Sequence, residues 1–357
     1  MNYLEVDDLH VSYRTGKGEV PAVRGVAFGL APGRKLGVAG ESGCGKSTVA
    51  LALLRLLPKS ARIQGRVLLD GEDVLTMRWG RLRAVRWAGA SIVFQGAMHS
   101  LNAVRRVGDQ IAEPIRLHGS APPDRVSQRV GELLDQVGLP PWRARAYPHE
   151  LSGGQRQRVM IAMALACEPR LVIADEPTTA LDVMIQAQIL RLIDRLVAEH
   201  GISMMMISHD LSVLAETCDR LAVMYAGRVV EEGPASAVYD DPRHPYAAAL
   251  SAAFPRIGDP ASRRAPHGLA GDPPDPADLP EGCSFRPRCA VAEHRCSAVD
   301  PVLWPVAGGN EGGAGRSAAC VRVLGDNAPE NADTVGAEAE PPGSDDVLPT
   351  QESGAQP

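Results

Sequence analysis

The chain has 357 residues, of which 45% are hydrophobic and 22% are charged, and its formal net charge is −6. This composition excludes an intrinsically disordered chain and is typical of a globular protein with one large domain or two ordinary ones. The sequence contains no apolar run of the ~18 residues that span a bilayer, and its start lacks the pattern of a secretory signal. We therefore expect a protein that stays on the cytosolic side.

Charge is distributed unevenly along the chain. From Asp326 onward there are eight acidic residues and no lysine or arginine; taking these eight from the total of 43 leaves 35 acidic against 37 basic residues. The rest of the chain is thus nearly neutral, which is not the footprint of a nucleic-acid-binding protein, and we expect no nucleic-acid partner. Residues 324–357 are predicted to form a disordered acidic tail, either a solvated end or an arm that binds a partner.

Short apolar runs alternate with helical patterns over the first 250 residues. Three continuous apolar runs predict buried strands of a sheet that is covered on both faces: residues 36–40, 171–174 and 203–207. Apolar residues at helical spacing predict helices at 126–137 and 185–197. This order predicts an α/β fold with a helical insertion between about 95 and 150.

Residues 40–47 match the phosphate-loop pattern G-x-x-x-x-G-K-[ST], between a predicted strand and a predicted helix. The glycines let backbone N–H groups face an anion, and the helix N-terminus adds its positive dipole. Lys46 would reach the β- and γ-phosphates, and Ser47 would bind Mg²⁺. The predicted nucleotide-binding residues of this loop are Gly40, Ser42, Gly43, Cys44, Gly45, Lys46, Ser47 and Thr48.

The predicted strand at 171–174 runs into Asp175 and Glu176. An acidic pair at a strand end lies where open α/β sheets bind their ligands. We expect Asp175 to hold Mg²⁺ through its water shell and Glu176 to polarise an attacking water.

Residues 151–155 read Leu-Ser-Gly-Gly-Gln and resemble the signature sequence of ATP-binding-cassette (ABC) ATPases. Ser152 can cap the helix that follows, and Gly153 and Gly154 leave open backbone for a γ-phosphate. The resemblance implies that Ser152, Gly153, Gly154 and Gln155 act on ATP bound by a partner subunit.

Four more positions resemble this family. The resemblance implies that Gln95 is the Q-loop residue, which contacts Mg²⁺ and the lytic water, and that Asp182 belongs to the D-loop. It also implies that His209 is the switch histidine and that Tyr13 stacks on adenine. The catalytic residues so implied are Glu176, His209 and Gln95, with Mg²⁺ held through Ser47, Gln95 and Asp175.

Three stretches are similar to the oligopeptide/dipeptide importer branch of the family. Residues 96–104 (GAMHSLNAV) follow Gln95 as DPMTSLNP follows the glutamine of that branch, although Gly96-Ala97 replaces Asp-Pro. The sequence VMIQAQIL after the D-loop and the sequence Arg-His-Pro-Tyr at 243–246 also match.

The last shared feature is a cysteine-bearing module with the spacing C-x5-C-x6-C-x23-C: Cys283, Cys289, Cys296 and Cys320. Four thiolates suit either tetrahedral Zn²⁺ or a [4Fe–4S] cluster, and simple reduced cysteines are the third alternative. The sequence lacks the C-x2-C pair of most structural zinc sites, and the branch resemblance implies a [4Fe–4S] cluster. Because the module has few apolar residues, we expect it to need a metal to fold.

The resemblance implies an ABC ATPase domain over 1–254 with a helical subdomain at about 95–167, a proline-rich linker at 255–282 and the Cys module at 283–323. It implies a peripheral protein on the cytoplasmic face of the membrane that hydrolyses ATP to energise oligopeptide or dipeptide import. Its partners would be a second ABC ATPase subunit, two transmembrane permease subunits and an extracytoplasmic substrate-binding protein.

Three other functions stay open at this point. A similar ATPase serves importers of nickel or haem, and a soluble ABC ATPase of DNA repair or translation shares the same motifs. A regulatory protein whose Cys module senses iron or redox state is the third. The soluble ATPases carry two cassettes or long coiled coils, and neither is found in this sequence.

Overall fold

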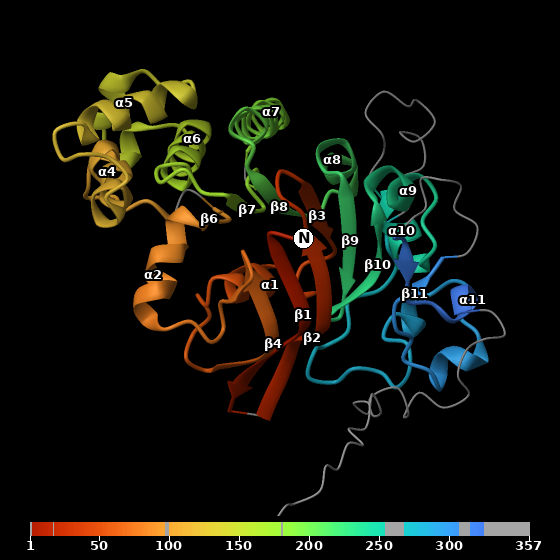
Figure 1. Ribbon diagram of the computed structural model, residues 1–357. Coiled ribbons are helices and arrows are strands. Elements are labelled where there is room, and N and C mark those ends of the chain that lie inside the picture. Colours follow the sequence, from red (N-terminus) through yellow and green to blue (C-terminus); the bar gives the residue numbers. More distant parts are fainter. Residues whose placement is uncertain are drawn as a thin grey trace, which may run out of the picture.

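The computed structural model describes residues 2–16, 18–96, 100–179, 181–253, 268–306 and 315–324. Two sheets form its centre (Figure 1), one of eight strands in the order β11-β12-β10-β9-β3-β8-β7-β6 and one of four in the order β2-β1-β4-β5. Parts of several predicted segments lie outside the described residues: 97–99 after Gln95, Ala180 beside the D-loop, 255–267 of the linker and the tail from 325.

The strands of the large sheet are β3 (Lys35–Ala39), β6 (Ala90–Val93), β7 (Leu171–Asp175), β8 (Ser203–Ser208), β9 (Arg220–Tyr225), β10 (Arg228–Pro234), β11 (Trp304–Pro305) and β12 (Ser317–Ala318). The small antiparallel sheet consists of β1 (Leu4–Thr15), β2 (Gly18–Leu30), β4 (Ala61–Leu69) and β5 (Glu72–Asp73). The three buried strands predicted from apolar runs are confirmed as β3, β7 and β8.

The helices are α1 (Lys46–Leu53), α2 (Trp79–Ala88), α4 (Val107–His118), α5 (Val126–Gln136), α6 (Gly153–Ala164), α7 (Val183–His200), α8 (Leu211–Thr217), α9 (Ala235–Asp240), α10 (Pro245–Ala253) and α11 (Val321–Leu324). Short 3₁₀ turns lie at Pro141–Arg145, Pro148–Glu150, Arg286–Arg288 and His294–Ser297. The predicted helices at 126–137 and 185–197 are confirmed as α5 and α7. Within the described residues, no helix is both long and apolar enough to cross a membrane.

Both faces of the large sheet are buried, which explains why its strands read as continuous apolar runs. Along β7, Leu171 and Ile173 belong to the core shared with α1 and the small sheet, whereas Val172 and Ala174 belong to the core under the helices. Helices α4, α5 and α6 lie together beyond β6 (Figure 1) and pack into the second of these cores. The structure is thus mixed α/β with a group of helices in the predicted region.

The cysteine-bearing segment is joined to the large sheet. Strand β12 pairs antiparallel with β10 and extends the large sheet, and β11 pairs with β12. Phe285 is buried in the main core. Sheet pairing and apolar contacts thus help to hold this segment, and the expectation that it needs a metal to fold stays a prediction. The described part of the linker, 268–282, contains no helix or strand, as its prolines predict.

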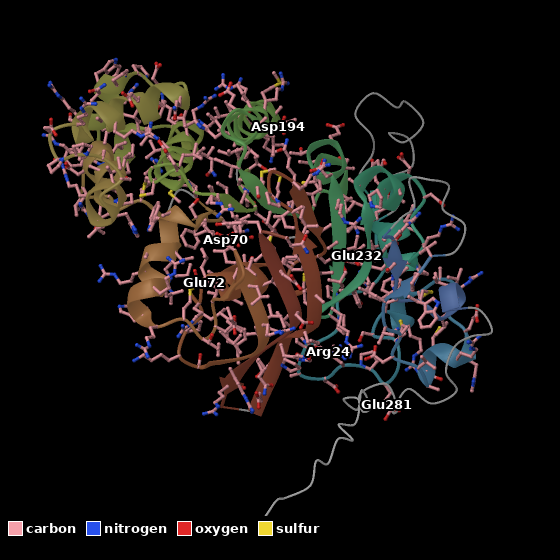
Figure 2. All side chains as sticks on the ribbon, in the orientation of Figure 1. Arg24, Asp70, Glu72, Asp194, Glu232 and Glu281 are labelled. Carbon is pink, nitrogen blue, oxygen red and sulfur yellow. The ribbon has the colours of Figure 1, made fainter. Side chains whose placement is uncertain are left out.

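Most charged side chains lie on the outside of the molecule (Figure 2), for example the pairs of Asp70 with Arg170 and Glu72 with Arg81. Among the described residues, the lysines, arginines, aspartates and glutamates that are buried as whole residues, backbone included, are Lys46, Asp175, Glu231 and Arg316. Two of them belong to the predicted nucleotide site, and the other two pair with each other.

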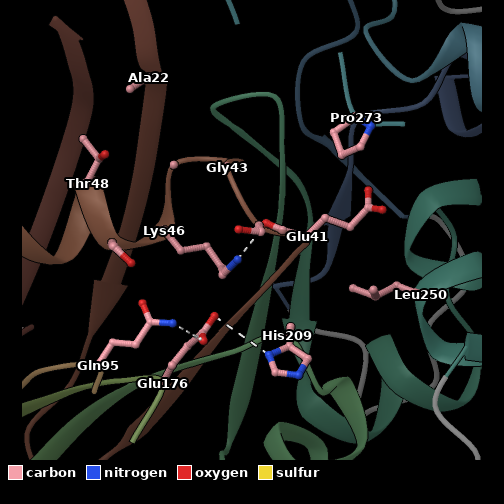
Figure 3. Close-up of a pocket in the computed structure, with 13 residues that line it drawn as sticks. Ala22, Glu41, Gly43, Lys46, Thr48, Gln95, Glu176, His209, Leu250 and Pro273 are labelled. Carbon is pink, nitrogen blue, oxygen red and sulfur yellow. Dashed lines mark hydrogen bonds and ion pairs between the residues drawn. The ribbon is translucent and has the colours of Figure 1, made fainter. Parts of the chain in front are cut away.

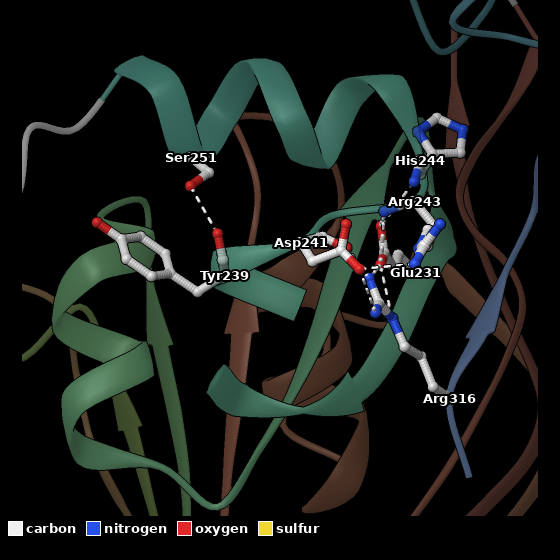
Figure 4. A network of polar contacts seen from close by, with 7 residues as sticks. All are labelled: Glu231, Tyr239, Asp241, Arg243, His244, Ser251 and Arg316. Carbon is white, nitrogen blue, oxygen red and sulfur yellow. Dashed lines mark hydrogen bonds and ion pairs between the residues drawn. The ribbon is translucent and has the colours of Figure 1, made fainter. Parts of the chain in front are cut away.

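That second pair fastens the C-terminal segment to the sheet (Figure 4). Arg316 Nη2 donates to Glu231 Oε1 at 2.8 Å, and the Glu231 carboxylate also accepts from the backbone N–H groups of Arg243 and His244 at 3.0 and 2.7 Å. Glu231 is fully buried, so its charge depends on these donors.

We expect Arg316→Met to lower the free energy of unfolding by about 3–5 kcal/mol, because it leaves a buried carboxylate without its cation. Urea unfolding followed by circular dichroism measures this change. The matched control is Arg34→Met, which breaks an exposed ion pair with Asp219 and should change stability little. Equal effects of the two substitutions would contradict this account of the buried pair.

Candidate active site

Four neighbouring parallel strands end at the same edge of the large sheet. The order there is β3-β8-β7-β6, with parallel pairing throughout. The chain leaves these strands into the phosphate loop, His209, the Asp175–Glu176 pair and Gln95 respectively. Residues far apart in sequence therefore meet at the carboxyl edge, where open α/β sheets bind ligands.

These residues surround a pocket of about 630 Å³ (Figure 3). Nine of the predicted site residues line it: Ser42, Gly43, Gly45, Lys46, Ser47, Thr48, Gln95, Glu176 and His209. The lining also includes four residues that were not predicted: Ala22, Glu41, Leu250 and Pro273. The volume and the glycine-rich wall with the ammonium of Lys46 suit a nucleotide phosphate chain.

The phosphate loop requires glycine at two positions. Gly40 has φ +151°, and a Cβ there would lie 2.3 Å from the carbonyl oxygen of Met224. Gly45 has φ +104°, and its Cβ would lie 2.4 Å from the carbonyl oxygen of Ala22. Neither position can carry a side chain without moving the backbone, so the loop path is fixed by its neighbours.

Lys46 is buried in this loop, at the first position of α1. Its Nζ donates to the backbone oxygens of Gly40 at 2.6 Å and Glu41 at 2.8 Å, and it lies 3.7 Å from Cys44 Sγ. These oxygens satisfy the ammonium protons without cancelling its charge, which leaves a cation at the wall of the pocket.

Ser47 and Asp175 form the predicted magnesium pair. The Ser47 hydroxyl donates to Asp175 Oδ1 at 3.1 Å. Asp175 is buried, and desolvation raises the pKa of its carboxyl group. Oxygen donors of this kind are the ligands that Mg²⁺ prefers, and Mg²⁺ needs only one or two from the protein because waters and phosphates supply the rest.

Glu176 is held from three sides. Gln95 Nε2 donates to its Oε2 at 2.7 Å, and the Thr179 hydroxyl donates to the same oxygen at 2.9 Å. His209 Nδ1 lies 3.9 Å from Oε1. The interaction with His209 lowers the pKa of Glu176 and raises the pKa of His209. The structure thus brings together the three residues predicted to be catalytic, with the carboxylate ionised.

Tyr13 lies next to the pocket without lining it. Its hydroxyl is 3.3 Å from Thr48 Oγ1, which places the ring beside the first turn of α1. Its stacking on adenine stays a prediction.

The signature residues lie on another face of the chain. Ser152 caps α6, where its hydroxyl accepts from Gln155 N at 3.3 Å and Gln155 Oε1 accepts from Ser152 N at 3.1 Å. A Cβ on Gly154 would lie 2.8 Å from Ile185 in the first turn of α7, and the D-loop residue Asp182 caps that helix. None of residues 151–155, all of which the structure describes, lines the pocket around Lys46. Their action on a partner's ATP stays a prediction.

The pocket residues that were not predicted differ in whether a sequence pattern could have identified them. No pattern marks Leu250 or Pro273, since α10 and the linker reach the pocket only through the tertiary fold. Glu41 could have been identified, because a carboxylate inside a loop that binds anions is unexpected.

The four C-terminal cysteines line one small cavity. All are free thiols, and burial raises the pKa of three of them, that of Cys283 to about 11. Within the described residues, no three His, Cys, Asp or Glu side chains are placed to hold a single metal ion.

We expect a pH titration followed by histidine NMR to give His209 a pKa above its usual range, because the ionised Glu176 favours the imidazolium. In Glu176→Gln this pKa should fall, and the charge of His209 should be lost at lower pH than in the unmodified protein. His118, whose pKa is lowered by burial, is the internal control. An unchanged His209 titration in Glu176→Gln would show that the two groups do not interact.

The sequence is similar to known families and proteins. Residues 23–179 match the ABC transporter family, and residues 230–296 match the oligopeptide/dipeptide transporter C-terminal region. A protein of Brucella abortus (strain 2308), named as a peptide import ATP-binding protein, is 46% identical over 303 residues, which are 84% of this chain and 91% of the relative. A protein of Brucella ovis with the same kind of name is 44% identical over 317 residues, 85% of this chain and 94% of the relative.

Solved structures resemble the same part of the chain. The dimeric post-hydrolysis state of an ATP-binding cassette bound to ADP and Pi has a TM-score of 0.58 at 27% identity and covers 65% of this chain and 98% of the cassette. A cassette from Clostridium perfringens, part of the ABC transporter complex CbiONQ, has a TM-score of 0.57 at 30% identity and covers 67% of this chain and 91% of the cassette. The chain therefore belongs to the ATP-binding subunits of ABC transporters, is an ATPase, and carries the C-terminal region of oligopeptide/dipeptide transporters.

Proposed function

We propose that this chain is the ATPase subunit that energises import of oligopeptides or dipeptides by an ABC transporter. The observation that carries the proposal is the presence, in one chain, of a pocket that joins the phosphate loop to Gln95, Glu176 and His209, and of the oligopeptide/dipeptide C-terminal region at 230–296. The names of the two Brucella relatives support the same substrate class.

In this proposal the phosphate loop binds the triphosphate of ATP. The backbone N–H groups of 40–48 and the ammonium of Lys46 hold the β- and γ-phosphates, and the N-terminus of α1 adds its dipole. Tyr13 stacks on the adenine ring.

Ser47, Gln95 and Asp175 would hold Mg²⁺, which would neutralise charge on the phosphate oxygens. The buried carboxylate of Asp175 beside the Ser47 hydroxyl fits this ion. The protein's own contribution is to fix these oxygens at the ends of β7 and α1.

Glu176 would orient and polarise the water that attacks the γ-phosphate. Gln95 and Thr179 fix its carboxylate, and the nearby His209 lowers the pKa of that carboxyl group. His209 would also stabilise the charge that develops on the γ-phosphate.

A second ABC ATPase subunit would complete the site. Ser152, Gly153, Gly154 and Gln155 lie at the N-terminus of α6, where exposed N–H groups can meet the γ-phosphate on a partner. A head-to-tail dimer would close around two ATP molecules and open after hydrolysis, with Asp182 at the interface.

Closure would act on two transmembrane permease subunits that contact the groove near Gln95, and an extracytoplasmic binding protein would deliver the peptide. The subunit would sit on the cytoplasmic face of the membrane. We assign residues 1–254 to the ATPase domain, with helices of about 95–167 as its helical subdomain, 255–282 to the linker, 283–323 to the Cys module and 324–357 to an acidic tail.

Glu176→Gln should retain ATP binding and lose at least about 100-fold in hydrolysis rate, because it removes the group that polarises water. The measurements are phosphate release and calorimetric ATP binding. Lys46→Ala is the matched variant for the phosphate-binding part of the site and should lose ATP binding. Undiminished hydrolysis by Glu176→Gln would remove Glu176 from this role.

We also propose that Cys283, Cys289, Cys296 and Cys320 hold a [4Fe–4S] cluster. Support comes from the donor set, since four free thiols line one cavity and four thiolates are the ligand set of such a cluster. The cluster would supply a redox-active cross-link between segments that the fold already brings together.

Protein purified anaerobically should contain about four iron and four sulfide per chain, with the broad visible absorption of a cluster. Cys289→Ser should lose both, whereas Cys218→Ser, which changes a buried core thiol, should keep them. One zinc per chain, or no metal, would overturn the cluster proposal and leave the ATPase site unaffected.

A further inference from the structure

The phosphate loop contains a carboxylate, which is an unfavourable charge in a loop that binds phosphate. Glu41 lines the pocket, directly after Gly40 and five residues before Lys46. An unpaired carboxylate at this place would repel a triphosphate across a partly buried site, where charge interactions are stronger than in water.

Arg288, from the cysteine-bearing segment, pairs with this carboxylate. Its Nη1 donates to Glu41 Oε2 at 2.6 Å and its Nη2 donates to Oε1 at 2.9 Å, a bidentate arrangement. The Arg288 side chain is only 5% exposed and that of Glu41 is 23% exposed, so solvent screens the pair weakly.

The guanidinium is itself held in place by the linker and the sheet. Its Nε donates to the backbone oxygen of Ala270 at 2.9 Å, and the group lies over the ring of Tyr225, 5.9 Å from the ring centre. Arg288 does not line the nucleotide pocket, among the residues that the structure describes there. It can therefore act on a nucleotide without contacting it, through Glu41.

The backbone of Glu41 is fixed as well. Its N–H donates to the hydroxyl of Tyr246, which is fully buried. Phe285 packs against Tyr225 and Tyr246 at ring distances of 5.2 and 5.3 Å, so the aromatic cluster that anchors the loop also includes the C-terminal segment. Both ends of this contact are thus rigid.

We propose that Arg288 is a positioning residue of the nucleotide site, which neutralises Glu41 and holds its carboxylate away from the phosphates so that the loop can bind ATP. The inference rests on the proposed nucleotide site and adds the C-terminal segment to it. ATP affinity then depends on a residue 247 positions away from Glu41.

The test is a double-mutant cycle on the full chain, with MgATP binding measured by calorimetry. Arg288→Met should weaken binding about tenfold, because it leaves the Glu41 charge unpaired. Arg288→Met combined with Glu41→Gln should bind within about twofold of Glu41→Gln alone, since no charge is left to repel the phosphates. In steady-state hydrolysis, Arg288→Met should raise the KM for ATP by the same factor and leave kcat unchanged, because Glu176, Gln95 and His209 are untouched.

The matched control is Asp300→Asn. Asp300 pairs with Arg24 and Arg228 and so ties the same segment to the sheet without touching the phosphate loop. It should lower the thermal midpoint and leave the Kd for MgATP unchanged. Arg288→Gln, which also removes the charge, carries the same cycle if Arg288→Met does not fold.

Wild-type affinity in Arg288→Met, no recovery in the double variant, or an equal loss in Asp300→Asn would overturn the inference. Each of these results presupposes that the unmodified chain binds MgATP. If the unmodified chain did not bind it, the proposed nucleotide site itself would fail.

Discussion

Strands β3, β8, β7 and β6 run in the same direction, so the chain leaves all four at one edge of the sheet. The groups that follow them must meet there, although Lys46 and His209 are separated by more than 160 residues. Each strand is buried on both faces, and a shift of one residue would exchange those faces. The apolar packing of the sheet therefore fixes the positions of the polar groups at its edge.

Most of the site is predictable from local patterns in the sequence. The phosphate loop, the acidic pair and the signature each occupy a few consecutive residues, and backbone geometry alone then fixes their arrangement. Gln95 and His209 both lie against Glu176, and the roles that family resemblance implied for them stay predictions. The magnitude of each role is a matter for kinetics.

Contacts between distant segments were not predictable in the same way. The Arg288–Glu41 and Arg316–Glu231 pairs join residues whose neighbourhood arises only when the sheet is complete. Strands β11 and β12 contain two residues each, too few to show any periodicity. For this reason the sequence does not reveal that the cysteine-bearing segment extends the main sheet.

The thiol cavity and the phosphate loop share one short stretch of chain. Cys289 follows Arg288 directly, within a segment whose Phe285 lies in the main core. A group bound in the cavity would therefore constrain the backbone of Arg288, the partner of Glu41. The same short segment thus carries both a cysteine of the cavity and the arginine of the buried ion pair.

The pairing of β12 with β10 also affects how the protein behaves while it is being made. Strand β10 has β9 on one side, and its other side is covered only when Ser317 and Ala318 arrive from the end of the described chain. Until then β10 presents a row of free N–H and C=O groups, the kind of edge through which nascent chains associate. A shortened chain that ends after α10 would leave this edge open and would also lose Arg288, the partner of Glu41, so we expect it to associate as well as to bind ATP less tightly.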